Sequence, residues 1–180
     1  MRKICICGGG NLGHVAAGFI AWRKQFEVSL LTRHPEQWSR QLIIDRPDGQ
    51  NLTTTLSRIS NDPHEVVADA DIVLLCLPGF SIREVLLQIR DHLRKDAAVG
   101  SVVSSTGFFF QAMEVLPADT PLFGLQRVPF ISRIKEYGHR ATLLGYKERL
   151  CVAVEQTRHR EELRLTVEQL FNTPTRLMGN

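Results

Sequence analysis

The fold is decided by the stretch Lys3-Ile-Cys-Ile-Cys-Gly-Gly-Gly-Asn-Leu-Gly-His14 near the start of the chain. Residues 4–7 predict a short strand, because apolar side chains that suit a β-sheet follow one another there. The glycines that come next have the spacing Gly-x-Gly-x-x-Gly, and residues 15–20 have the apolar content of a helix packed on a sheet. A strand, a glycine turn and a helix in this order are the context of a dinucleotide-binding motif. A glycine-rich turn without a ligand is the alternative, and the position of the motif favours binding.

Each glycine of the motif has a separate expected role. Gly8 allows the tight turn, Gly10 lets the backbone approach a pyrophosphate, and Gly13 lets the helix lie against the first strand. Asn11 and Leu12 begin the helix, whose free N–H groups and positive dipole end face the phosphates. We therefore predict that Gly8, Gly10, Asn11, Leu12 and Gly13 bind the cofactor.

The end of the second expected strand, residues 27–31, bears on the choice of cofactor. An acidic residue about 20 positions beyond the glycines binds the ribose of NAD, whereas an arginine accommodates the 2′-phosphate of NADP. Thr32 stands where the acid is expected, and Arg33 follows it with a planar set of donors suited to phosphate. The sequence favours NADP, with NAD as second choice. An arginine that is merely solvated at a strand end is the alternative.

Two later loops are candidates for contacts with the nicotinamide. Residues 71–77 predict a strand that is buried on both faces, and Pro78-Gly79 ends it. A further strand over residues 98–103 is followed by a loop, residues 104–107, that contains Thr106. Ligands of open α/β sheets bind at the carboxyl ends of the strands, where both loops belong. Ordinary connections between strands and helices are the alternative.

The whole pattern predicts an α/β fold of the Rossmann type, doubly wound, with a mostly parallel sheet. A hairpin over residues 42–56, with its turn at Pro47-Asp48-Gly49, is inserted in it. We expect a dinucleotide-binding domain over residues 1–155 and a helical tail over 156–180, the start of a second domain that is missing. The other expected elements are helices over 81–93, from 108 and over 161–171, a strand over 122–125, and two short strands over 141–145 and 150–154 that form an antiparallel pair.

Composition narrows the class of protein. The chain has 180 residues, of which 43% are hydrophobic and 23% charged, as in ordinary soluble globular proteins. The net charge is only +3 and the basic residues are scattered, which speaks against nucleic acid as a partner. No apolar run is long enough to span a membrane, and we expect a cytoplasmic protein. No metal site is expected, and buried, reduced thiols are expected at the four cysteines, Cys5, Cys7, Cys76 and Cys151.

Four stretches together resemble a known family. They are KICICGGGNLGH (residues 3–14), DADIVLLCLPGFSI (69–82), GFFFQA (107–112) and RVPFISRIKEYG (127–138). They are similar to the N-terminal domain of opine dehydrogenases of the octopine and nopaline type. Ketopantoate reductases and glycerol-3-phosphate dehydrogenases are more distant in likeness. The resemblance covers residues 3–155, and its most specific part is RVPFISRIKEYG.

The resemblance implies a reaction and further site residues. Opine dehydrogenases condense an amino acid with a 2-oxo acid such as pyruvate and reduce the product with NAD(P)H. Carried over by position, the glycines and Arg33 hold the cofactor, and Leu77, Pro78 and Gly79 lie beside the nicotinamide. Gln111 and Arg133 border the small-molecule substrate. A salt bridge that ties down its segment is the alternative role for Arg133.

The chain departs from the family at its C-terminal end. Members carry a second, all-helical domain that supplies the catalytic histidine, whereas this sequence stops at Asn180. Its own histidines are no convincing general acids, and we assign no catalytic residue. We therefore expect an enzyme that is incomplete without a helical domain from a longer chain or a partner. A stand-alone NADP(H)-binding module and a fragment similar to ketopantoate reductase are the alternatives.

Overall fold

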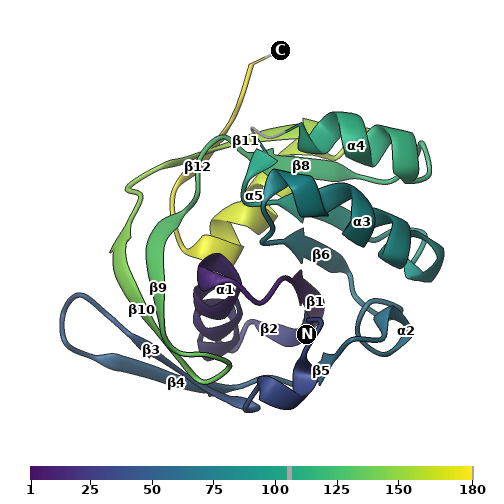
Figure 1. Ribbon diagram of the computed structural model, residues 1–180. Coiled ribbons are helices and arrows are strands. Elements are labelled where there is room, and N and C mark those ends of the chain that lie inside the picture. The colour runs from purple at the N-terminus through teal and green to yellow at the C-terminus, as the bar shows by residue number, and fades with distance from the viewer. Residues whose placement is uncertain (105–106, 180) are drawn as a thin grey trace.

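The computed structural model describes residues 1–104 and 107–179, and an eight-stranded sheet forms its centre (Figure 1). Six neighbouring strands are parallel, while the two at one edge run the opposite way. The order of strands reverses its direction between β1 and β6, which makes this the switch point of a Rossmann fold, as predicted. In spatial order the strands are β12 (Thr175–Leu177), β11 (Leu150–Glu155), β8 (Leu122–Leu125), β7 (Ala98–Ser101), β6 (Ile72–Leu75), β1 (Arg2–Cys7), β2 (Phe26–Leu31) and β5 (Arg58–Ser60).

Helices cover both faces of this sheet (Figure 1). Alternate side chains of β1 point to opposite faces: Ile4 and Ile6 lie in the core beneath α1 and α5, while Cys5 and Cys7 lie with α2, α3 and α4. Burial on both sides explains the unbroken apolar runs of β1 and β6. The helices are α1 (Asn11–Trp22), α2 (Pro63–Val66), α3 (Gly79–Ile89), α4 (Phe108–Val115) and α5 (Arg160–Phe171), with 3-10 turns η1 (Pro35–Gln37) and η2 (Arg90–His92).

A second sheet of four strands packs on the outer side of α1 (Figure 1). Its order is β4 (Asn51–Thr55), β3 (Gln41–Asp45), β10 (Arg140–Tyr146) and β9 (Phe130–Glu136). The predicted hairpin is therefore present as β3 and β4, and β10 extends it in parallel. Helix and sheet approach closely, since a Cβ atom added to Gly18 would lie 2.5 Å from Ile44 Cγ1. Helix α1 is thus enclosed between two sheets.

The expected pairing of residues 141–145 with 150–154 is wrong. Strand β10 pairs with β9 and β3, whereas β11 pairs with β8 and β12 in the central sheet. The apolar patterns located both strands but did not identify their partners. A turn at Gly138, whose φ of +71° suits a glycine, folds β10 back on β9. This local hairpin forms instead of a pairing between β10 and β11.

The segment expected as a helical tail, residues 156–180, is described up to residue 179, and its helix α5 packs on the central sheet. Val167, Leu170 and Phe171 of α5 are buried in the same core as β1. After Asn172, which has a left-handed φ of +49°, the chain returns and adds β12 parallel to β11. Three residues form β12, which is too short a run for a periodic pattern to reveal. The tail therefore contributes to the packing of the dinucleotide-binding fold.

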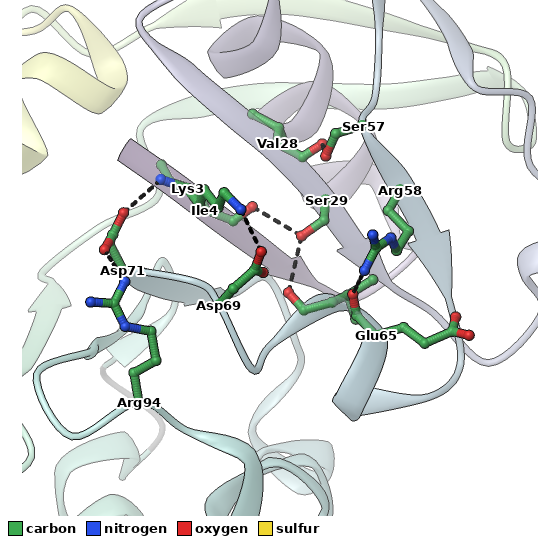
Figure 2. A network of polar contacts seen from close by, with 11 residues as sticks. Lys3, Ile4, Val28, Ser29, Ser57, Arg58, Glu65, Asp69, Asp71 and Arg94 are labelled. Carbon is green, nitrogen blue, oxygen red and sulfur yellow. Dashed lines mark hydrogen bonds and ion pairs between the residues drawn. The ribbon is translucent and has the colours of Figure 1, made fainter. Parts of the chain in front are cut away.

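Polar contacts fix the start of β1, at the end of the central sheet opposite the glycine loop (Figure 2). The carboxylate of Asp71 accepts the backbone N–H of Lys3 at 2.8 Å, and the Lys3 carbonyl accepts the N–H of Asp71 at 2.9 Å. Arg94 Nη1 donates to the other Asp71 oxygen at 2.6 Å. On the neighbouring strand, Ser29 Oγ lies 3.2 Å from the carbonyl oxygen of Ile4. These contacts hold β1 at the end opposite the glycine loop.

The second sheet is held together by a nearly buried carboxylate. Asp45, at the end of β3, is 8% exposed. It accepts hydrogen bonds from Arg140 Nη2 at 2.9 Å and from Lys135 Nζ at 2.7 Å. The hydrogen bond from Arg140 is the main cause of the lowered pKa of this carboxyl, and Lys135 adds to it. Asp45 therefore links β3 to both strands of the β9–β10 hairpin.

We predict that Asp45→Asn lowers the free energy of unfolding by about 1 kcal/mol at pH 7. A carboxyl whose pKa is lowered by folding stabilises the fold at pH values above its ordinary pKa. This stabilisation is lost as the pH falls through the folded pKa. The difference between wild type and variant should therefore shrink toward about pH 3.5, measured by urea unfolding. Asp119→Asn, at an exposed turn, is the control. A loss of equal size at both pH values would contradict the ionic role of Asp45.

Candidate functional site

The glycine loop lies at the switch point, against the ends of β2 and β6. Gly8 has a φ of +121°, and a Cβ atom added to it would lie 2.6 Å from the carbonyl oxygen of Cys76. Its N–H donates to the carbonyl of Leu31 at 3.1 Å. A Cβ atom on Gly13 would lie only 1.9 Å from the carbonyl oxygen of Gly8. Both positions therefore require glycine, because the loop, the strand end and the helix touch there.

The space over Gly10 is open, unlike the space around Gly8 and Gly13. Gly10 is the N-cap of α1 and has an extended backbone with a φ of −84°. Apart from Gly10 and its two chain neighbours, no atom of the described residues lies within 4 Å of a Cβ atom built on it, and Gly10 has no side chain to cap the first turn of α1. An open cradle therefore faces the positive end of a helix, a geometry that suits a pyrophosphate.

Asn11 and Leu12 present only their backbone to this cradle. The side-chain oxygen of Asn11 accepts the N–H of Ile134 at 2.8 Å, which ties the start of α1 to β9. Leu12 is half-buried against the core. Asn11 and Leu12 can therefore bind an anion only through their backbone N–H groups in the first helical turn.

The end of β2 carries the residues predicted to select the cofactor. Thr32 is nearly buried, and its N–H donates to the carbonyl of Ser60 at 3.0 Å. Arg33 is exposed. Glu36 lies nearby in sequence, and its carboxylate pairs with the ring of His34 at 3.3 Å. Thr32 therefore offers a hydroxyl group at the strand end, and Arg33 offers a positive charge that is exposed to solvent.

The loop after β6 contacts the glycine loop. Leu77 Cδ2 would lie 2.9 Å from a Cβ atom on Gly8, so the two loops touch. Pro78 is exposed and is the N-cap of α3, which begins at Gly79, two residues before the expected start. Leu77, Pro78 and Gly79 therefore stand at the carboxyl edge of the sheet, as predicted. Thr106, in the loop after β7, lies outside the described residues.

The two predicted substrate residues come from different parts of the fold. Gln111 is half-buried on α4, and its N–H donates to the carbonyl of Gly107 at 3.2 Å. Arg133 lies on β9 of the second sheet, where it is exposed and donates to the carbonyl of Ser132 at 2.8 Å. The next residue of the strand, Ile134, donates its backbone N–H to Asn11. Because side chains alternate along a strand and Phe130 and Ser132 are buried toward the core, the exposed Arg133 side chain lies on the outer face of the second sheet, away from α1.

Sequence reasoning missed an aromatic cluster beside the glycine loop, formed by His14, Trp38 and Tyr137. The His14 ring centroid lies 4.1 Å from that of Trp38 and 5.1 Å from that of Tyr137. Trp38 Cζ2 and the Tyr137 hydroxyl both lie close to Gly9. A histidine within an otherwise apolar helical run was the available signal, because such a side chain needs buried partners.

His14 joins α1 to the second sheet. It is 1% exposed, its Nδ1 lies 2.9 Å from the carbonyl oxygen of Gly10, and its Nε2 accepts the N–H of Gly138 at 2.7 Å. Both bonds require the neutral ring with its hydrogen on Nδ1. Burial lowers the pKa of His14, more than the bond to Gly10 raises it. This histidine is therefore a structural link, with both nitrogens engaged.

Three of the four cysteines, Cys5, Cys7 and Cys76, are buried free thiols as predicted, whereas Cys151 is a free thiol that is only half-buried. Burial raises the pKa of Cys76 to about 12. Throughout residues 1–104 and 107–179, no group of three or more metal-binding side chains could hold an ion. Within the same ranges, no helix has the length and apolar character to cross a membrane.

Comparison with known proteins identifies the family. The sequence model described as "Ketopantoate reductase PanE/ApbA" matches residues 4–125. The chain belongs to this family. Octopine dehydrogenase of Pecten maximus is 30% identical over 168 residues, which are 84% of this chain and 42% of that protein. The chain thus spans about two fifths of the length of this curated relative.

Solved structures agree with this assignment. A structure of octopine dehydrogenase with NADH and L-arginine has a TM-score of 0.91 and 26% identity, covering 99% of this chain and 49% of that one. The predicted resemblance to opine dehydrogenases is therefore confirmed. Yersinopine dehydrogenase bound to NADP+, at 17% identity and a TM-score of 0.72 over 100% of this chain and 48% of that one, shows the fold alone.

We predict that His14 makes the stability of the domain depend on pH. Its folded pKa lies below the ordinary value of about 6.5, so the unfolded chain binds protons first as the pH falls. The free energy of unfolding should therefore decrease from about pH 7 downward, until the pH reaches the folded pKa. Urea unfolding between about pH 7.5 and pH 5 measures this slope, and His14→Gln should flatten it.

His139→Gln is the matched control, since His139 lies beside the same turn with a partly exposed ring. It should keep the slope of the wild type. The role of His14 is contradicted if the His14→Gln chain loses stability toward low pH as steeply as the wild type does.

Proposed function

We propose that the chain is the NAD(P)-binding domain of an oxidoreductase similar to opine dehydrogenases. The main support for this proposal is the open cradle over Gly10, which lies at an uncapped helix start beside the switch point of the sheet. In this proposal the pyrophosphate lies on Gly8, Gly10 and Gly13 and on the first N–H groups of α1. The adenosine half extends toward Thr32 and Arg33, and the nicotinamide half toward Leu77, Pro78, Gly79 and Thr106.

The proposed substrates are an amino acid and a 2-oxo acid. Octopine dehydrogenase has been solved with NADH and L-arginine, with NADH and agmatine, and with NADH and pyruvate, which supports this class. The dinucleotide supplies the hydride for reductive condensation, while this chain's residues bind and orient. Gln111 offers an amide beside the loop after β7. Arg133 is proposed as a substrate residue from the resemblance alone, since its guanidinium lies on the outer face of the second sheet.

We further propose that the chain does not complete the reaction alone. None of the six histidines lies in the loops after β6 and β7, and His14 has both nitrogens engaged. Phe80 and Phe110, in the first turns of α3 and α4, are 89% and 82% exposed. Such exposed rings fit a further helical domain, supplied by a longer chain or a partner.

Two alternatives share the same site. A stand-alone NADP(H)-binding module would bind the dinucleotide without turnover, and a domain of a ketopantoate-reductase-like dehydrogenase would act on a different small molecule. The family match over residues 4–125 supports the ketopantoate-reductase-like alternative. The four free thiols fit a reducing compartment, and we propose a cytoplasmic location.

We predict that the wild-type chain binds NADH and NADPH and that Gly10→Val abolishes binding without unfolding the domain. The valine would occupy the cradle, while its backbone geometry suits any residue. Calorimetric titration measures binding, and thermal unfolding checks the fold. Gly145→Val is the matched control, since open space also surrounds Gly145, on β10. Unchanged affinity in Gly10→Val, or steady NADPH oxidation by the wild type with pyruvate and an amino acid, would contradict these proposals.

We predict that the chain prefers NADPH to NADH by roughly ten- to a hundredfold, because Arg33 can give the 2′-phosphate charge-assisted hydrogen bonds. Thr32→Asp combined with Arg33→Ala should reverse the preference, by adding a ribose acceptor and removing the cation. Because Arg33 is exposed, added salt should weaken NADPH more than NADH. Titrations of both dinucleotides at low and high salt measure this. Equal affinities of the wild type at low salt would return the assignment to NAD.

A further inference from the structure

The tip of the β9–β10 hairpin reaches the glycine loop from the second sheet. A Cβ atom added to Gly9 would lie 2.6 Å from Tyr137 Oη and 3.1 Å from Thr32 Oγ1. Two hydroxyl groups therefore meet over the backbone of the loop, one from each sheet. Tyr137 is 42% exposed, so a molecule that lies on the loop has access to it. The sequence analysis assigned no role to this tyrosine.

The position of the Tyr137 hydroxyl is set by its surroundings. The next residue, Gly138, donates its N–H to buried His14 Nε2 at 2.7 Å. A Cβ atom on Gly138 would lie 2.1 Å from the carbonyl oxygen of Gln37, so the hairpin tip lies directly on η1. The Tyr137 ring meets those of His14 and Trp38 edge-on, with centroids 5.1 and 5.7 Å apart. Backbone contacts and two rings thus fix the place of the hydroxyl.

We infer that Tyr137 is a dinucleotide-binding residue whose hydroxyl donates a hydrogen bond to an oxygen of the adenosine diphosphate half. The inference rests on the proposed function. Gly9 lies between the cradle of Gly10 and the end of β2 at Thr32, and so between the proposed places of the pyrophosphate and the adenosine ribose. A phenolic O–H is a good donor to phosphate and ribose oxygens. The second sheet then contributes directly to the binding site.

The test compares two tyrosine variants by calorimetric titration with NADH, ADP and nicotinamide mononucleotide. Tyr137→Phe keeps the ring against His14 and Trp38 and removes only the hydroxyl. Tyr146→Phe is the matched control: it is the only other tyrosine, is 44% exposed on β10 of the same sheet, and packs near Phe19. Thermal unfolding of both variants reports the fold.

Tyr137→Phe should weaken NADH and ADP by the same factor, roughly tenfold, and leave the mononucleotide unaffected. Tyr146→Phe should bind all three as the wild type does. In a Trp22→Phe chain, where Trp38 is the only remaining tryptophan, ADP should change the emission and the mononucleotide should not.

Three results would overturn the inference. If Tyr137→Phe binds NADH and ADP as tightly as the wild type, the hydroxyl does not contact the ligand, while the proposed function still stands. If only the mononucleotide is weakened, Tyr137 faces the other half of the cofactor. If the wild-type chain binds no dinucleotide at all, the proposed function fails and the inference fails with it.

Discussion

The close approach of Gly13 to the carbonyl oxygen of Gly8 is the contact on which the rest of the structure depends. A Cβ atom at Gly13 would lie 1.9 Å from that oxygen, so α1 can follow β1 this closely only with glycine there. The contact directs the start of α1 at the switch point between β1 and β6. It also holds α1 flat on the central sheet, which leaves its outer side to the second sheet. The open cradle at the start of α1 and the second layer over this helix both depend on this geometry.

The second sheet extends this constraint into the proposed site. Asn11 accepts the N–H of Ile134, and His14 accepts that of Gly138, so the first turn of α1 is bound to β9 and to the turn after it. A loop held on both sides has little conformational freedom left to lose when a ligand binds. Preorganisation of this kind improves affinity without adding contacts. We therefore expect the buried neutral histidine to support dinucleotide binding through the position of the loop, without touching the ligand itself.

Local signals predicted most of the fold. The glycine motif and the apolar runs of residues 4–7 and 71–77 identified the Rossmann sheet, because strands buried on both faces read as unbroken apolar segments. The start of α2 is also fixed locally, since the Asp62 carboxylate, directly before Pro63, accepts the N–H of His64 at 2.9 Å. Partners of strands were not readable, since β10 pairs in parallel with β3, which lies about a hundred residues earlier.

The site was predicted in part for a similar reason. Glycine spacing and the residues at strand ends are local, and the structure places Gly8, Gly10, Thr32 and Leu77 at the carboxyl edge. The hydrogen bond from the Ile134 N–H to the Asn11 side chain joins residues that are more than a hundred positions apart. The same holds for Tyr137 over Gly9. Pattern and spacing indicate at most that buried His14 needs partners, and they do not identify Trp38 and Tyr137 as those partners.

In the proposed function, a nicotinamide dinucleotide binds with its pyrophosphate on the glycine loop. Backbone amide NMR of the wild-type chain during titration with NADPH tests this binding mode residue by residue, because each N–H reports on its own surroundings. We expect saturable shifts concentrated at residues 8–14, at Thr32 and Arg33, and at residues 77–79, with few changes along β4 and α5. Shifts that avoid the glycine loop, or no saturable shift at any amide, would contradict it.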